Sequence, residues 1–346
     1  MKEKLEEWLT KAYYEKASDV HMTIGKAPIF RVNGTLIEQD GPKLESTDML
    51  SFVKAITLND QWEHLQQHRE LDFSYGIDGL SRFRMNAFFQ RGELSLAIRL
   101  VPTRIPSIEE LHLPTVAKDI VHKPQGLVLV TGPTGSGKST TLASMLHYMN
   151  QTMKKHIITL EDPIEYMHTH AKSVIDQREV GFDTNSFAGG LRASLRQDPD
   201  VILVGEMRDL ETISTAITAA ETGHLVLGTL HTSGSVSTIE RIIDVFPSEQ
   251  QTQIRIQLSS ILNAVISQRL LKTKDGLDRR VATEVLVNTS AVKNLIRNEK
   301  LHQVQNVLQT SKEQGMHTLE MDLKRLLQKD VISYETAAPF FSNSVT

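Results

Sequence analysis

The stretch GPTGSGKS at positions 132–139 constrains the fold of this chain more than any other part of its sequence. It follows an apolar run at 127–130 and precedes Leu142, Met145 and Leu146, which are spaced as on one face of a helix. The pattern G-x-x-x-x-G-K-[ST] between a strand and a helix is that of a P-loop. Its glycines let backbone N–H groups crowd around phosphate oxygens, while the helix N-terminus and the Lys138 ammonium add positive charge. The alternative is a glycine-rich turn that binds nothing.

We therefore expect the loop to bind the phosphates of a nucleotide, and the Ser139 hydroxyl to bind Mg²⁺. The predicted nucleotide-binding residues are Gly132, Pro133, Thr134, Gly135, Ser136, Gly137, Lys138, Ser139 and Thr140.

Short apolar runs predict the architecture of the second part of the chain. The runs at 127–130, 157–160, 201–204 and 225–227 are typical of strands buried on both faces. Segments long enough for helices separate them, so we predict an α/β domain with a parallel sheet over 119–346. Apolar residues then recur at helical spacing, which predicts a mostly helical region over about 247–346. They are Ile254, Leu258, Ile261, Leu262, Val265 and Ile266, followed by Leu319, Leu323, Leu326 and Leu327.

The first 100 residues predict a small α+β domain. Apolar residues between Leu5 and Tyr13 follow helical spacing, and strands are expected at 19–24, 29–32, 35–37, 81–89 and 94–100. Asn33-Gly34 predicts a two-residue hairpin between two of these strands, because both residues tolerate positive φ. Three prolines predict a linker over 101–118, and 342–346 should be a frayed terminus.

The composition excludes several kinds of chemistry. The 346 residues contain no cysteine, which rules out disulfides, cysteine–zinc sites, iron–sulfur clusters and a thiol nucleophile. With 38 Lys and Arg against 42 Asp and Glu, the formal charge of −4 gives no overall basic surface, and we expect no direct nucleic-acid binding. The sequence contains neither a run of about 20 apolar residues nor a signal-peptide pattern, so a cytoplasmic location is expected.

Two expected strands end in carboxylates. Glu206 follows the apolar run at 201–204, and ligands of parallel sheets bind at the carboxyl ends of the strands. It could hold the water shell of Mg²⁺ or polarise the attacking water. Glu161 follows the run at 157–160, and we favour a water-activating role for it, although a solvated acidic turn is the alternative.

Two histidines flank the strand expected near 225–227. His224 and His231 are seven residues apart, so on one regular strand they would point to opposite faces. His231 lies at the carboxyl end and is the better candidate for sensing the γ-phosphate, while a purely structural histidine is the alternative. A zinc site at His168 and His170 is not expected, because no further ligands recur at zinc spacing.

The first domain carries several arginines, among them Arg82, Arg84 and Arg99. Arg82 and Arg84 share a face of their expected strand, so a basic strip could face the phosphates. Ordinary surface charge explains the same residues.

Four motifs in fixed order resemble the secretion and type IV pilus ATPase superfamily, in which they are called the Walker A, Asp box, Walker B and His box. They are GPTGSGKST at 132–140, ITLEDPIEY at 158–166, LRQDPDVILVGEMRD at 195–209 and TGHLVLGTLHTS at 222–233. The chain resembles the PilT-like type IV pilus retraction ATPases more closely, through ASDVHMTIGKAPIFRVNG, RFRMNAF, GEMRDLETISTAITAAETGHLV and DVFPSEQQ.

The resemblance implies a PAS-like N-terminal domain and a RecA-like ATPase domain, assembled as a homohexameric ring in which nucleotide lies between the domains. It implies ATP and Mg²⁺ as cofactors, with Glu161, Glu206 and His231 in catalytic roles. Arg84 and Arg99 would contact phosphate. The implied motor pulls pilin out of the fibre, acting through an inner-membrane platform protein on the cytoplasmic side of the membrane.

One segment departs from the retraction family. At 291–298 the chain reads AVKNLIRN where that family has AIRNLIRE, so Asn298 replaces the final Glu. We expect this change to affect coupling to the pilus machinery and to leave catalysis untouched. Assembly and secretion ATPases of the superfamily typically carry a four-cysteine zinc subdomain and an extra N-terminal domain, so the absence of cysteine and the length favour retraction. The alternatives are a pilus or pseudopilus assembly or type II secretion ATPase, a DNA-translocating ATPase and a nucleotide-dependent scaffold.

Overall fold

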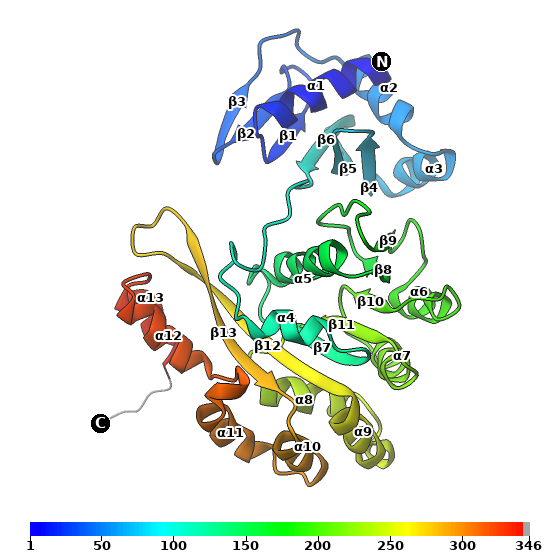
Figure 1. Ribbon diagram of the computed structural model, residues 1–346. Helices are drawn as coiled ribbons and strands as arrows, with labels where there is room; N and C mark the ends of the chain where they lie inside the picture. The colour runs from blue at the N-terminus through cyan, green and yellow to red at the C-terminus, as the bar shows by residue number, and fades with distance from the viewer. Residues whose placement is uncertain (342–346) are drawn as a thin grey trace. The chain divides into compact units, whose positions relative to one another are not determined.

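A computed structural model describes residues 1–341 of the chain as two compact units (Figure 1). Unit 1 comprises Met1–Arg104 with Glu165–Met167, and unit 2 comprises Ile105–Ile164 with the chain from His168 onward. The expected frayed terminus at 342–346 lies outside the described residues. Within residues 1–341, no helix combines the length and the apolar character needed to cross a membrane.

Unit 1 is built on an antiparallel six-stranded sheet in the order β3-β2-β1-β6-β5-β4. Its elements are α1 (Lys2–Tyr14), β1 (Asp19–Met22), β2 (Ile29–Val32), β3 (Thr35–Glu38), α2 (Ser46–Ile56), α3 (Asn59–His68), β4 (Glu70–Ile77), β5 (Ser81–Gln90) and β6 (Glu93–Leu100). Asn33 and Gly34 have φ of 50° and 84°, which confirms the predicted hairpin. We predicted no element between residues 46 and 77, where α2, α3 and β4 lie.

The unit 1 sheet is covered on one face. Val20, Ile98 and Met85 lie side by side in register on β1, β6 and β5 and are buried in one core with residues of α1 and α2. The alternate residues Asp19, Arg99 and Arg84 form the neighbouring register row, so they point to the other face. The alternation of polar and apolar residues that predicted these strands thus reflects a one-sided sheet.

Unit 2 contains a seven-stranded sheet in the order β13-β12-β7-β11-β10-β8-β9. All neighbouring strands are parallel except β13, which runs antiparallel to β12. The strands are β7 (Gly126–Thr131), β8 (His156–Glu161), β9 (Val174–Glu179), β10 (Val201–Val204), β11 (Leu225–Leu230), β12 (Leu262–Lys272) and β13 (Arg279–Val287). The predicted buried parallel sheet is confirmed.

Helices cover both faces of this sheet. The helices are α4 (Val116–Val121), α5 (Lys138–Thr152), α6 (Phe187–Ser194), α7 (Leu210–Glu221), α8 (Ser235–Asp244), α9 (Ser248–Ile261), α10 (Ser290–Arg297), α11 (Val304–Thr310), α12 (Leu319–Gln328) and α13 (Tyr334–Ala337). Leu127 and Leu129 of β7 pack with α6 to α11, whereas Val128 and Val130 pack with α4 and α5. Because both sets of β7 side chains are buried, the strand is apolar throughout.

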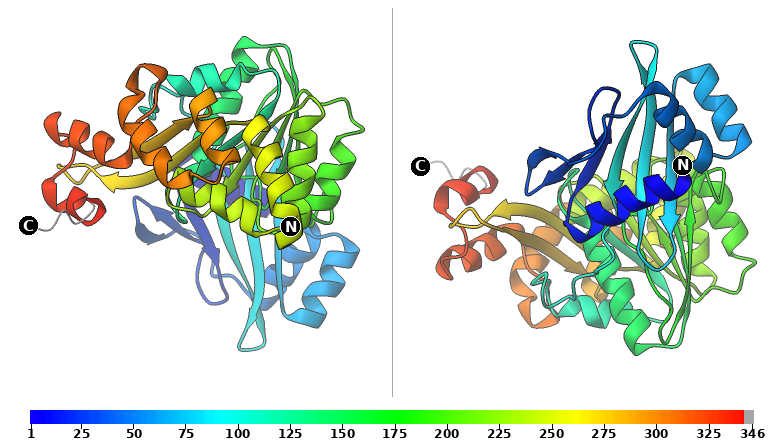
Figure 2. Two further views of the ribbon diagram at one scale, coloured as in Figure 1. Left: turned by 90° about the horizontal axis from the view of Figure 1, so that it is seen from below. Right: turned by 90° about the horizontal axis from the view of Figure 1, so that it is seen from above.

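Two parts of unit 2 differ from the sequence predictions. The helical spacing extended to Val265 and Ile266, but α9 ends at Ile261 and β12 begins at Leu262. A strand buried on both faces is apolar at nearly every position, so a helical pattern can be traced through it. The region also contains β13, and α12 and α13 lie beside the far end of the β12–β13 hairpin in every view (Figure 1, Figure 2).

The segment expected to be a linker, 101–118, contains residues that belong to unit 2. Ile108, Leu113 and Ala117 are buried in the same core as Leu142 and Met145 of α5. The segment is thus exposed at 102–104 but partly anchored in the core of unit 2 further on.

Candidate active site

Strand order brings the four motifs to one edge of the unit 2 sheet. Strands β7, β11, β10 and β8 are consecutive neighbours, and all run in the same direction. Thr131 pairs with Leu230, and Val204 pairs with both Gly228 and Leu160. The residues that follow these pairs are the P-loop, His231, Glu206 and Glu161, so they share the carboxyl edge where parallel sheets bind ligands.

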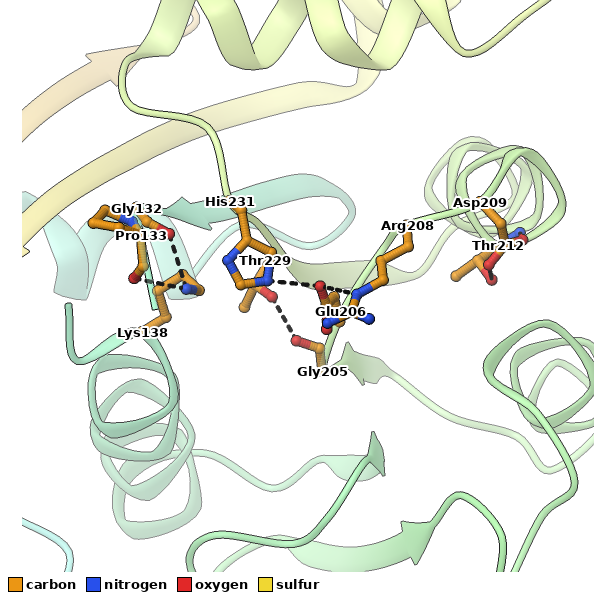
Figure 3. Close-up of polar contacts among 10 residues, drawn as sticks. All are labelled: Gly132, Pro133, Lys138, Gly205, Glu206, Arg208, Asp209, Thr212, Thr229 and His231. Carbon is orange, nitrogen blue, oxygen red and sulfur yellow. Dashed lines mark hydrogen bonds and ion pairs between the residues drawn. The ribbon is translucent and has the colours of Figure 1, made fainter. Parts of the chain in front are cut away.

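The P-loop wraps around its own lysine. Gly132, Gly135 and Gly137 all have positive φ, which a side chain would disfavour. Lys138 begins α5, and its Nζ donates to the carbonyls of Gly132 at 2.9 Å and Pro133 at 3.1 Å (Figure 3). The ammonium group is therefore held inside the loop at the positive end of a helix, the arrangement that binds phosphate.

Ser139 and Thr140 complete the predicted set in the first turn of α5, and Thr134 and Ser136 lie within the loop. Ser136 is 3% exposed, and its backbone N–H donates to Pro133. The loop therefore joins directly to a helix whose next turns, including Leu142 and Met145, are anchored in the core.

Glu206 and His231 come together from neighbouring strands, as Figure 3 shows. The Nε2 atom of His231 lies 2.7 Å from Oε1 of Glu206, and Arg208 donates from Nε to the same oxygen. The loop after β10 is fixed on β11, because Thr229 donates from its hydroxyl to the Gly205 carbonyl and accepts the Met207 N–H on its own carbonyl. The carboxylate is therefore fixed at the carboxyl edge of the sheet.

The surroundings of Glu206 favour its charged form. Burial opposes ionisation, but the hydrogen bonds from Arg208 and His231 outweigh it, and the pKa of Glu206 lies below its ordinary value. The Glu206 side chain is 20% exposed, whereas those of His231 and Arg208 are 44% and 75% exposed. A charged, partly buried carboxylate beside a P-loop can accept a proton from water.

Two neutral donors contact Glu161. Its Oε1 accepts from the Thr159 hydroxyl at 2.6 Å and from Nε2 of Gln177 at 3.1 Å. Thr159 is on the same strand, and Gln177 is on the neighbouring strand β9. The Gln177 side-chain oxygen also accepts the backbone N–H of His168 at 2.8 Å, so one amide joins Glu161 to the loop after β8.

Sequence reasoning missed several residues of this site. Arg208 follows Glu206 by two positions, which indicates proximity but not the contact. Gln177 is 16 residues from Glu161, and only the pairing of β8 with β9 brings them together. Asp209 was also missed. Its carboxylate accepts the backbone N–H and the hydroxyl of Thr212, both at 2.8 Å, and thereby caps α7 immediately after the Glu206 loop.

The other histidines lie elsewhere. His224 contacts the Ala219 carbonyl at the end of α7 through Nδ1, at 3.0 Å. Burial, with a smaller effect from His147, lowers the pKa of His168 to about 4, and His170 accepts the backbone N–H of Ile175. Within residues 1–341, no three His, Cys, Asp or Glu side chains are grouped to hold a metal ion.

Arg84 and Arg99 belong to unit 1, whereas the P-loop belongs to unit 2. They are opposite each other on β5 and β6. Arg99 pairs with Asp19 on β1 at 3.0 Å, and Arg31 of β2 lies 3.8 Å from the same carboxylate. These contacts form a polar row across the face of the sheet that unit 1 leaves uncovered.

The segment that departs from the retraction family forms α10. Asn298 follows its last residue, and Nδ2 of Asn298 donates to the Asn294 carbonyl at 3.0 Å and to its side-chain oxygen at 2.6 Å. The next residue, Glu299, pairs with Arg255 of α9 at 3.2 Å. Asn298 thus closes the helix without adding a negative charge.

Comparisons with known proteins show the family of the chain. The family described as Type II/IV secretion system protein matches residues 1–336. The chain is 48% identical to the Type IV pilus retractation ATPase PilT of Pseudomonas aeruginosa, over 93% of either protein. It is 47% identical to a twitching motility protein of Neisseria gonorrhoeae, covering 92% of this chain and 85% of the relative. The crystal structure of the pilus retraction motor PilT with bound ADP superimposes with a TM-score of 0.90, at 47% identity, covering 98% of this chain and 97% of that one.

Proposed function

Because the chain belongs to the family of type II/IV secretion system proteins, we propose that it is an ATP-hydrolysing motor that powers type IV pilus retraction. One observation carries the proposal. The contact between Glu206 and His231 lies at the same sheet edge as a P-loop, in a chain similar over nearly its whole length to a retraction ATPase.

Hydrolysis follows from the residues at this edge. The loop amides and Lys138 bind the β- and γ-phosphates. Glu206 accepts a proton from the attacking water, which its low pKa allows because the carboxylate stays charged at neutral pH. The imidazole of His231 is held against Glu206 by their contact at the ends of β11 and β10. From this position it senses the γ-phosphate. Glu161 is the second acid, and it orients water from the β8 side.

The residues present fit a magnesium ion. Mg²⁺ is usually held by one or two protein oxygens together with substrate phosphates, and it keeps several waters. Ser139 at the start of α5 and Glu206 at the same sheet edge offer a hydroxyl and a carboxylate of this kind. Ser139 would hold the ion directly and Glu206 through water, and the ion would neutralise charge on the phosphates.

The finer architecture is part of the proposal. Unit 1 would be the PAS-like domain, unit 2 the RecA-like ATPase domain, and the assembly a homohexamer with nucleotide between the domains. Arg84 and Arg99 would supply phosphate contacts, which their position on the uncovered face of the unit 1 sheet supports. The protein would act in the cytoplasm at the pilus base, on a platform protein in the inner membrane and through it on pilin, with no direct contact to nucleic acid.

Deleting the gene in a piliated host tests the proposed direction of work. We expect extra pili that do not retract, and their retraction restored by the wild-type gene. Loss of all pili would identify an assembly motor instead. Unchanged pilus number and retraction would refute a role in pili.

A further inference from the structure

A buried glutamine outside the four motifs contacts the P-loop. Gln268 lies on β12 and is 1% exposed. Its Nε2 donates to the Ser136 carbonyl in the loop at 2.7 Å, and its Oε1 accepts from the Thr141 hydroxyl at the start of α5 at 3.0 Å. From this geometry we infer that Gln268 is a positioning residue, which holds the P-loop in its phosphate-binding conformation.

The direction of the Ser136 carbonyl explains how a contact outside the loop acts inside it. The bond between Ser136 and Gly137 is trans, since the only cis bond within residues 1–341 joins Asp162 to Pro163. In a trans peptide the C=O and N–H point in opposite directions. Fixing the carbonyl on Gln268 therefore turns the Gly137 N–H away from β12. Phosphate binding depends on the directions of such N–H groups, so Gln268 fixes one donor without touching the nucleotide.

The same residue lies against both ends of the loop. A Cβ atom on Gly132 would stand 2.4 Å from the Gln268 carbonyl oxygen, and one on Gly137 would stand 3.4 Å from its Nε2. Gly132 and Gly137 have φ of 143° and 86°. The first glycine is therefore required by the close approach of β12 as well as by its own backbone conformation.

A carboxamide of this length satisfies both contacts. Its nitrogen donates and its oxygen accepts. Glutamate at this position could accept from Thr141 but could not donate to Ser136, and methionine would fill a similar volume while making neither hydrogen bond.

The support for the loop comes from a part of the chain that carries none of the four motifs. Gln268 is opposite Thr283 on β13. The backbone N–H of Thr283 donates to Asp322 of α12 at 2.8 Å, and Asp322 is paired with Arg325. The strand that bears Gln268 is thus anchored to the C-terminal helices.

The inference rests on nucleotide binding at the P-loop, as proposed above, and ADP binding to the purified full-length protein tests it. We expect Gln268→Met and Gln268→Glu each to raise the Kd for ADP about tenfold, because each variant loses the bond to Ser136. Thr141→Val removes only the contact to α5, and we expect it to raise the Kd less than about threefold. The ³¹P resonance of the β-phosphate in bound ADP should shift in both Gln268 variants.

Asn150 offers a matched control at the other end of α5. It is also a carboxamide that is 1% exposed, and it binds the backbone of Thr169 and Ala171 at 2.6 and 3.1 Å. Asn150→Leu should lower the melting temperature as Gln268→Met does, yet leave the Kd for ADP within about twofold of the wild-type value. An equal loss of affinity in Asn150→Leu would reduce the Gln268 effect to general destabilisation and overturn the inference.

Wild-type affinity and an unchanged ³¹P resonance in a folded Gln268 variant would also overturn it, while the proposed function would stand. If Gln268→Met does not fold, Gln268→Glu decides, because it keeps the shape of the side chain and can still accept from Thr141. A wild-type protein that fails to bind ADP would refute the proposed function and the inference together.

Discussion

Strands β8 and β10 are neighbours, and each brings a glutamate to the same edge of the sheet. Strand β8 ends at Glu161, whereas Glu206 follows the end of β10. The two carboxylates are held in different ways. Glu161 accepts from two neutral groups, the Thr159 hydroxyl and the Gln177 amide. Glu206 accepts from the guanidinium of Arg208 and contacts the imidazole of His231.

The two sets of contacts have different effects on a carboxylate. Neutral donors orient a carboxylate, whereas a guanidinium also stabilises its negative charge and keeps its pKa low. Glu161 accepts one hydrogen bond from its own strand, β8, and one from the neighbouring strand, β9. Glu206 lies beyond its strand and is tied to groups that are themselves partly exposed. We propose that Glu206 takes the proton and that Glu161 orients the water.

Glu206→Gln should have the largest effect. The amide keeps the shape but cannot take a proton, so we expect kcat for ATP hydrolysis to fall about a hundredfold or more. The Kd for ATP should change little, because the P-loop is untouched. Steady-state phosphate release and equilibrium ATP binding measure the two effects, and wild-type turnover would refute the assignment.

Glu161→Gln should have a smaller effect, because the amide can still orient water through its oxygen. We expect kcat to fall about tenfold, measured in the same assay. If the loss exceeded that of Glu206→Gln, the two roles assigned above would be reversed.

Gln177→Leu tests the neutral support of Glu161 without altering a carboxylate. One hydrogen bond to Glu161 is lost, so kcat should fall about threefold to tenfold while the KM for ATP stays near the wild-type value. Gln257→Leu is the control, since the Gln257 side chain donates to the exposed Glu221. Equal activity of the two variants would show that Glu161 needs no support from β9.

Arg208→Ala should have the smallest effect at neutral pH and a clear one in acid. Burial raises the pKa of Glu206, and the hydrogen bond from Arg208 is the largest influence that lowers it. Removing the guanidinium therefore raises this pKa, so the carboxylate is protonated at a higher pH.

In this variant the decline of kcat on acidification should begin at higher pH than in the wild type. The pH dependence of kcat measures it, and Arg192→Ala, which breaks an exposed ion pair with Glu211, should leave the profile unchanged. An acid limb that stays in place would show that Arg208 does not control the charge of Glu206.

Local patterns predicted the parts of the fold that depend on local physics. Asn33-Gly34 predicted its hairpin, and the apolar run at 127–130 predicted a strand covered on both faces. The boundary at Ile261 could not be predicted, because α9 and β12 follow each other directly and the apolar residues of both fit one helical spacing. What separates them is the pairing of β12 with β7, more than 130 residues earlier in the sequence.

The candidate site divides in the same way. Glu206 and His231 could be placed at one edge from their positions after apolar strands, since parallel strands align their ends. Gln177 and Gln268 could not be found, because each acts across a strand pairing, β9 with β8 and β12 with β7, that no local pattern specifies. Glutamine also has no distinctive spacing, so only its hydrogen bonds reveal its role.

We propose that ATP hydrolysis at Glu206 drives retraction. The most direct test is pilus retraction in a piliated host whose own copy of the gene is deleted, complemented with the wild type or with Glu206→Gln at equal protein levels. We expect the wild type to restore retraction and Glu206→Gln to leave extended pili. Restored retraction by Glu206→Gln would contradict it.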